Sequence, residues 1–479
     1  MNLEQFLIYI HLGVYDVAQQ FFLYELTNQD RKLLRLVSRA INLVVLEYPI
    51  LTTLFISTFS PDLDYLEVVS KNEKLLKHVS KLWWDNSVFY LCFLLGGDLR
   101  EYYVSYRHRT GHLEQADEEA SVSAWRAHGA SQRRNLENDR DRAVLEMILP
   151  TLKNVTTVAF DISSIRCAEF HRRPTYHTYK NIYHAKEYHA PIYSGWIKAA
   201  GTYLPWSGKK SYEDEVTADF EAQEPKSKFW NFLPVRGIKI FHDLLSREQS
   251  NGSFDLSIGL QYFFPKLETL ILKGYPTELY SSRVGGPVYQ VIQESCIQEL
   301  HISLTESDFT DSQTTGYEGI PAVTFANSRS LRFLTIDCDQ GMQYEEDIPS
   351  IMRVISELLP QLVALVALTI SMDPIKTTHS DLVAFAKAVG ACKSLKTLNM
   401  GEVTLEYDEV WEDVLGSWKE SGDLNGLNVI RLEPVSYVVD AEGETWRIEH
   451  SHRNGSAIVD WLHGETTQFP IRSDPSYRI

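Results

Sequence analysis

The chain has 479 residues, and its 64 acidic and 46 basic residues give a formal net charge of −18 at pH 7. This balance argues against nucleic-acid binding, because phosphate-binding domains normally carry a basic excess. Five scattered cysteines without a C-x-x-C pair are typical of a reducing compartment. No signal peptide or membrane span is recognisable, so we expect a cytoplasmic or nuclear protein that binds no membrane.

Residues 1–50 predict a small module of amphipathic helices. Apolar residues recur at helical spacing over 14–46, with a break near Asn28. Asn28 and Asp30 are residues that cap helices, so a second helix is expected to begin there and continue to Val45. Basic residues occupy the face opposite its apolar side chains: Arg31, Lys32, Arg35 and Arg39.

The amino-acid sequence of this module resembles an F-box. The segment 34–39, Leu-Arg-Leu-Val-Ser-Arg, matches the Leu-x-x-Val-Ser/Cys-Arg/Lys pattern of that family. The resemblance implies docking on a Skp-type adaptor within a cullin ubiquitin ligase. Seven apolar positions are the candidate adaptor-binding residues: Val17, Phe21, Leu33, Leu34, Leu36, Val37 and Ile41. The same side chains suit internal packing of the helices, so both roles stay open.

Residues 51–160 predict the first repeat-like units, interrupted by a charged helical insertion. Strands and solvated helices are expected to alternate: strand 54–57, helix 63–77, strand 79–84, helices 113–129 and 133–147, and strand 155–160.

Residues 161–232 predict an irregular insertion rich in aromatic residues and histidine. Among its histidines, His184 and His189 are five residues apart, so on a helix they point about 140° apart and do not form a metal-binding pair. Trp206–Lys210 contains the Gly-Lys of a phosphate loop, but Tyr203 stands where the first glycine of that loop belongs. Neither pattern predicts a metal or phosphate site.

A six-residue phrase, Leu-x-x-Leu-x-Ile with small variations, returns through residues 233–434 at steps of about 30 to 34 residues. It begins at seven positions: Val235, Leu267, Ile297, Leu331, Leu365, Leu395 and Leu427. Helical stretches are expected after three of the phrases: 346–359, 379–389 and 408–420. A unit of one strand and one helix cannot bury its own apolar face, so the units are expected to stack on one another.

Residues 435–479 predict a cap for the open end of this array. Segments 437–439 and 446–448 flank a plausible hairpin turn, and 457–463 predicts a short helix that Gly464 ends. The expected fold is therefore α/β, an N-terminal α-helical F-box-like module followed by an irregular leucine-rich-repeat-like solenoid of strand–helix units. This order resembles F-box proteins of filamentous fungi.

Motifs for catalysis are absent from the sequence: it has no Gly-x-Ser-x-Gly, no Gly-x-Gly-x-x-Gly and no cysteine-rich metal spacing. The acidic run 402–413 is expected to form the solvent-exposed face of a helix. We therefore expect no enzyme, no cofactor and no metal.

The resemblance implies a substrate receptor of a cullin-type ubiquitin ligase, which binds an unknown protein substrate through its repeat surface. The alternative is a repeat-based interaction scaffold with a decayed F-box, since Gly13-Val14 stand where Leu-Pro is usual. A third hypothesis, the least favoured, is a hydrolase within the insertion 161–232.

Overall fold

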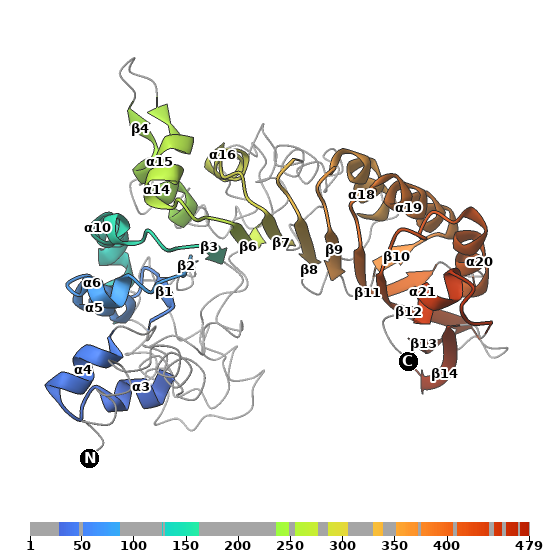
Figure 1. Ribbon diagram of the computed structural model, residues 1–479, viewed down its shortest axis with the longest axis horizontal. Coiled ribbons are helices and arrows are strands. Elements are labelled where there is room, and N and C mark those ends of the chain that lie inside the picture. Colours follow the sequence, from blue (N-terminus) through green and yellow to red (C-terminus); the bar gives the residue numbers. More distant parts are fainter. Residues whose placement is uncertain are drawn as a thin grey trace, which may run out of the picture. The chain divides into compact units, whose positions relative to one another are not determined.

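The computed structural model describes residues 28–46, 51–86, 127, 130–161, 236–248, 254–275, 286–304, 329–338, 351–371, 375–405, 410–439, 445–452, 457–467 and 470–478. Over these ranges the chain is a mixed α/β protein in which parallel strands alternate with helices (Figure 1). It divides into two compact units. Unit 1 holds the described residues up to Phe160 together with Asp243–Leu267, and unit 2 holds most of the rest, from Glu268 onward.

Unit 1 begins with two short helices, α3 (Asn28–Leu34) and α4 (Arg39–Val45). The expected single helix over this stretch is wrong, because the chain turns at residues 35–37. The Ser38 hydroxyl accepts a hydrogen bond of 3.2 Å from the Ile41 N–H, which is the bond an N-capping serine makes. Ser38 therefore starts a new helix where the periodicity suggested continuation.

The first strands of unit 1 lie where the sequence predicted them: β1 (Thr53–Ile56), β2 (Lys81–Asp85) and β3 (Thr157–Asp161), in that order within the sheet. β1 and β2 are parallel, with Phe55 opposite Trp83. The expected helix 63–77 is divided into α5 (Ser60–Val69) and α6 (Glu73–Leu76). Ser70 ends α5, since its hydroxyl donates a hydrogen bond of 2.8 Å to the main-chain oxygen of Glu67.

The charged segment before β3 is also divided. Residues 130–137 are helical, and α10 (Arg140–Ile148) follows after Asp139, whose φ of 49° is left-handed. The expected helix 133–147 is thus two helices. It is not wholly solvated either, because Val144, Leu145 and Ile148 form a buried stripe at helical spacing. A short 3-10 turn, η2 (Leu149–Thr151), contains Pro150. The expected helix 113–129 lies outside the described residues, except residue 127.

One predicted strand is a helix instead. The phrase Val235-Ile238-Ile240 falls at the start of α14 (Arg236–Leu245), which begins in unit 2 and ends in unit 1. Ile238, Phe241 and Leu245 are fully buried. Their spacing of three and four residues places them on one face of a helix, and this longer pattern overrides the short phrase.

Unit 1 ends with a two-stranded hairpin, β4 (Arg247–Glu248) and β5 (Phe254–Asp255), and with α15 (Leu256–Phe263). A Cβ atom at Gly259 would lie 1.7 Å from the main-chain oxygen of Leu245. Only glycine allows α15 to pack this closely against the end of α14.

The sheet of unit 2 contains six parallel strands, which lie side by side in Figure 1. They are β6 (Thr269–Tyr275), β7 (Glu299–Leu304), β8 (Phe333–Cys338), β9 (Ala367–Ser371), β11 (Thr397–Leu405) and β12 (Val429–Val439). β10 (Ile375–Thr377) also pairs with β11. Six of the seven phrases are therefore confirmed as strands.

The register aligns the same phrase positions across these six strands, except that it shifts between β11 and β12 after Asn399. The fourth positions form one buried row: Leu270, Leu300, Leu334, Leu368, Leu398 and Ile430. The sixth positions form a second: Leu272, Ile302, Ile336, Ile370, Met400 and Leu432. Burying each such side chain stabilises the fold by about 1.5–3 kcal/mol, so the two rows are the core of the sheet.

A repeated main-chain contact joins successive strands. In the parts of the chain that the structure describes, seven main-chain carbonyl groups lie just before a strand. Each accepts hydrogen bonds of 2.7–3.2 Å from two N–H groups of the next strand–helix repeat. The acceptors are Thr52 and Ser80 in unit 1 and Glu268, Gln298, Arg332, Val366 and Lys396 in unit 2. We call this set the carbonyl ladder. It holds neighbouring strands in one register.

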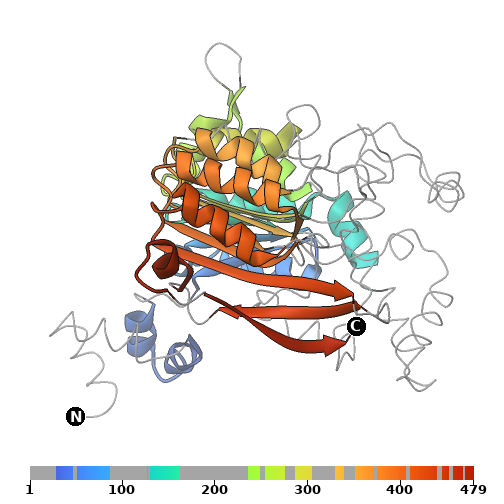
Figure 2. The ribbon, with the colours of Figure 1, turned by 90° about the vertical axis from the view of Figure 1, so that its right-hand side faces the viewer.

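The helices of unit 2 are α16 (Gly286–Glu294), α18 (Ile351–Leu358), the 3-10 turn η6 (Leu359–Gln361), α19 (His379–Ala391) and α20 (Trp411–Ser421). Three of them correspond to the expected helical stretches, although residues 346–350 and 408–409 lie outside the described ranges. α18, α19 and α20 lie side by side along one face of the strands (Figures 1 and 2).

The end of unit 2 is antiparallel. β13 (Thr445–His452) pairs with β12, so the expected hairpin is confirmed, and α21 (Ala457–Leu462) is the expected short helix before Gly464, whose φ is 76°. The final strand, β14 (Ile471–Arg478), pairs with β13 and was not predicted (Figure 2). Within the described ranges, no helix combines the length and the apolar composition needed to span a bilayer.

Candidate protein-interaction site

The turn between α3 and α4 exposes three apolar side chains. Leu33 is 53% exposed, Leu36 82% and Val37 56%. The N–H of Leu36 bonds to the oxygen of Leu33, and that of Val37 to the oxygen of Leu34, so the chain keeps turning after α3. Leu33 therefore has both Leu36 and Val37 as neighbours, three and four residues away. We call Leu33, Leu36 and Val37 the α3–α4 patch. Single exposed apolar residues are ordinary, so it is the grouping of three within five residues that makes this patch a candidate contact surface.

The other candidate adaptor-binding residues have different positions. Ile41 is fully buried with Val45 and Leu46, and Leu34 is half-buried. Ile41 therefore packs inside the unit and is not available to a partner. Val17 and Phe21 lie outside the described residues.

Basic side chains accompany the patch. Arg39 is exposed and Arg35 is half-buried, with its Nε donating a hydrogen bond of 2.8 Å to Asn42 Oδ1. Arg31 is mostly buried, and this burial lowers the pKa of its guanidinium. Arg35 also lies close enough to Tyr65 of α5 for its charge to lower the pKa of that phenol, although burial has the larger effect and raises it.

The two helices are attached to the rest of unit 1. A ring nitrogen of His78, which follows α6, lies 3.2 Å from the main-chain oxygen of Leu46 at the end of α4. Together with the buried Ile41 and Val45, this contact gives the α3–α4 patch a fixed support.

A second candidate surface lies on the sheet of unit 2, on the face opposite the buried rows. Its side chains alternate with the core residues along each strand and are partly exposed. One row contains Glu299, Phe333, Ala367, Thr397 and Val429, and the next contains His301, Thr335, Thr369, Asn399 and Arg431. We call these ten residues the open face. Phe333 is its large exposed ring, with the Arg332 guanidinium 5.6 Å from the ring centre.

Asn399 leaves one buried hydrogen-bond acceptor of the sheet without a partner among the residues described. Its Nδ2 donates to Thr369 Oγ1 at 3.2 Å, while its Oδ1 is buried and has no hydrogen-bond partner among the residues described. A buried acceptor without a partner costs about 1–3 kcal/mol.

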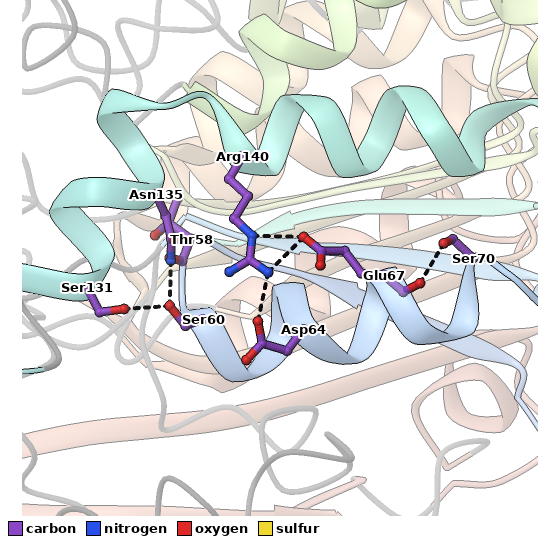
Figure 3. A network of polar contacts seen from close by, with 8 residues as sticks. All are labelled: Thr58, Ser60, Asp64, Glu67, Ser70, Ser131, Asn135 and Arg140. Carbon is purple, nitrogen blue, oxygen red and sulfur yellow. Dashed lines mark hydrogen bonds and ion pairs between the residues drawn. The ribbon is translucent and has the colours of Figure 1, made fainter.

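Unit 1 contains a network of charged and hydroxyl side chains (Figure 3). Arg140 of α10 points toward α5, where its Nη2 lies 2.7 Å from Asp64 Oδ1 and its Nε lies 2.8 Å from Glu67 Oε1. Burial alone would lower the pKa of Arg140, but its hydrogen bonds to Asp64 and Glu67 raise it overall. Both carboxylates are engaged by this arginine, so they are not a pair for acid–base catalysis.

The rest of that network connects the start of α5 to helix 130–137. Asn135 Nδ2 donates to the main-chain oxygen of Thr58 and to Ser60 Oγ, each at 2.9 Å, and the hydroxyls of Ser60 and Ser131 lie 2.5 Å apart (Figure 3). These contacts join segments more than seventy residues apart in the sequence. We infer that these contacts stabilise unit 1 by joining the start of α5 to helix 130–137.

The two sequence patterns compared with metal and phosphate sites lie outside the described ranges: His184 with His189, and Trp206–Lys210. Within those ranges, no three His, Cys, Asp or Glu residues are grouped as metal ligands. The acidic run 402–413, expected on one helix, begins in a strand, because Glu402 belongs to β11. Glu412 and Asp413 are exposed in the first turn of α20, where the helix dipole favours negative charge.

Comparison with known proteins leaves the site to be interpreted from its own geometry. No protein-family model matches the sequence, and no curated protein matches it.

Proposed function

We propose that this protein is an F-box-like substrate receptor of a cullin-type ubiquitin ligase. The α3–α4 patch would dock on a Skp-type adaptor, and the open face would bind a protein target. The observation that supports adaptor docking best is the exposure of Leu33, Leu36 and Val37 within the segment that resembles an F-box. Apolar side chains on a fixed support are suited to a stable protein contact.

We also propose that the strand–helix units form an irregular leucine-rich-repeat-like solenoid. The support is the carbonyl ladder, which recurs in both units with the same geometry, together with the two buried rows of unit 2. Repeats that contact only their neighbours leave one long face for binding.

The receptor would perform no bond chemistry. It would hold its target beside the catalytic part of the ligase and so raise the effective concentration of target lysines, which can reach millimolar for two linked sites. The open face, with the exposed Phe333 ring as an apolar contact, is the part that would select the target.

Adaptor capture tests this function. Tagged full-length protein should retain a purified Skp-type adaptor, and Leu36→Asp with Val37→Asp should weaken retention at least about tenfold, because two charges would be buried in an apolar contact. The matched control is Val363→Asp, since Val363 is 66% exposed and belongs to unit 2. The control should bind like the wild type, and thermal unfolding should show that all variants are folded.

Failure of the wild-type protein to retain the adaptor would remove the ligase function and leave the alternative, a repeat-based interaction scaffold with a decayed F-box. The observation that favours this alternative is Gly13-Val14 in place of the Leu-Pro usual in an F-box. In that case the open face would still bind its target.

A further inference from the structure

The α3–α4 patch lies in a basic island of an acidic protein. Four of the nine residues from Arg31 to Arg39 are basic and none is acidic, although the whole chain has a net charge of −18. Arg35 stands between Leu33 and Leu36 in the turn, and the exposed Arg39 follows two residues after Val37. Positive charge is therefore placed next to the exposed apolar side chains.

We infer that the partner of the α3–α4 patch presents an apolar centre bordered by carboxylates, with Arg35 and Arg39 facing those carboxylates. This inference rests on the proposed function and describes the kind of surface that the adaptor must carry there.

Charge complementarity is the reason for this assignment. A chain with a net charge of −18 repels an acidic partner at long range, whereas a local positive rim attracts it and orients it over the patch. The attraction acts within about 10 Å at 0.1 M salt, which is the Debye length. A basic rim therefore changes mainly the association rate and its dependence on salt.

A membrane surface fits the same residues less well. A helix that lies in a bilayer needs a continuous apolar face. After Val37, the next apolar residues at helical spacing are Ile41 and Val45, and both are fully buried. Among the side chains of α3 and α4 that the structure describes, the exposed apolar area is thus limited to one turn, which is suited to a protein pocket.

The test compares two charge reversals in the full-length protein, with binding to purified Skp-type adaptor measured by biolayer interferometry at low and high salt. Arg39→Glu should weaken binding about three- to tenfold at low salt, mostly through a slower association rate, and the difference should vanish near 0.5 M salt. Arg39→Lys should restore most of the affinity. The matched control is Lys387→Glu, an equal charge change at an exposed position of α19, and it should bind like the wild type.

The outcomes distinguish adaptor docking itself from the acidic border of the adaptor surface. If Leu36→Asp with Val37→Asp abolishes binding while Arg39→Glu has no effect beyond that of Lys387→Glu, the acidic border is wrong and adaptor docking stands. If the wild type does not bind the adaptor, both are wrong. Binding of the wild type to phosphatidylserine vesicles, lost in Arg39→Glu and without any adaptor binding, would assign the patch to a membrane instead.

Discussion

The indole N–H of Trp418 on α20 donates a hydrogen bond of 3.1 Å to the main-chain oxygen of Leu382 on α19. Both residues are buried, so this bond joins two neighbouring helices where water is excluded. Trp418→Phe should keep most of the ring packing and lose the bond, which leaves a buried carbonyl with one partner fewer. We expect a loss of about 1–2 kcal/mol in the free energy of unfolding, against about 3–5 kcal/mol for Trp418→Ala.

Urea unfolding measures both values. The control is Trp461→Phe, because Trp461 is only half-buried and its ring is contacted by Lys419 Nζ at 4.1 Å. It should cost less than about 0.5 kcal/mol. Equal losses for the two Trp→Phe variants would show that the bond to Leu382 contributes nothing.

Two glycines within helices should respond in opposite ways to alanine. At Gly259 the new Cβ atom would lie 1.7 Å from the oxygen of Leu245, whereas at Gly416 of α20 nothing lies within 4 Å. Gly259→Ala should destabilise by more than about 3 kcal/mol or prevent folding, because backbone must move. Gly416→Ala should stabilise by about 0.5–1 kcal/mol through its higher helix propensity. Thermal unfolding distinguishes them, and a tolerated Gly259→Ala would contradict the close approach of α14 and α15.

Tyr65 gives unit 1 a specific sensitivity to alkaline pH. Burial raises the pKa of its phenol, and the nearby charge of Arg35 only partly opposes this. The unfolded chain therefore releases this proton at lower pH than the folded protein, so folding stability falls as pH rises above the ordinary tyrosine value of about 10. Tyr65→Phe should show a smaller loss of stability between pH 9 and 11 in urea titrations. The same pH dependence in wild type and variant would exclude a contribution from Tyr65.

The repeat could be predicted from the sequence because the stacking of parallel strands determines both the spacing of the apolar residues and the register of the strands. In stacked parallel strands each phrase position meets its equivalent in the next unit, as Leu334 meets Leu368, so the apolar positions must recur in step. The α14 phrase was misread because three apolar residues fit a strand and a helix equally until Phe241 and Leu245 are included. β14 has no apolar alternation and contains Pro475, so only its pairing with β13 reveals it.

The candidate site was predicted only as a set of residues. Leu36 and Ile41 are both apolar and belong to the same predicted helix, yet Leu36 is 82% exposed and Ile41 is fully buried. The difference arises from the turn at residues 35–37 and the cap at Ser38, which reorient α4 relative to α3. Helical periodicity alone assumes a straight helix and cannot separate the two.

The carbonyl ladder has a consequence for how this protein can diverge. Its seven acceptors are Thr, Ser, Glu, Gln, Arg, Val and Lys, with no residue type used twice. A main-chain oxygen accepts the same bonds whatever side chain it carries, so mutation at these positions leaves strand alignment intact. Only proline at a donor position, such as Thr397, would remove a bond. The side chains at these seven positions are thus free to change in character while the main-chain alignment of the strands stays the same.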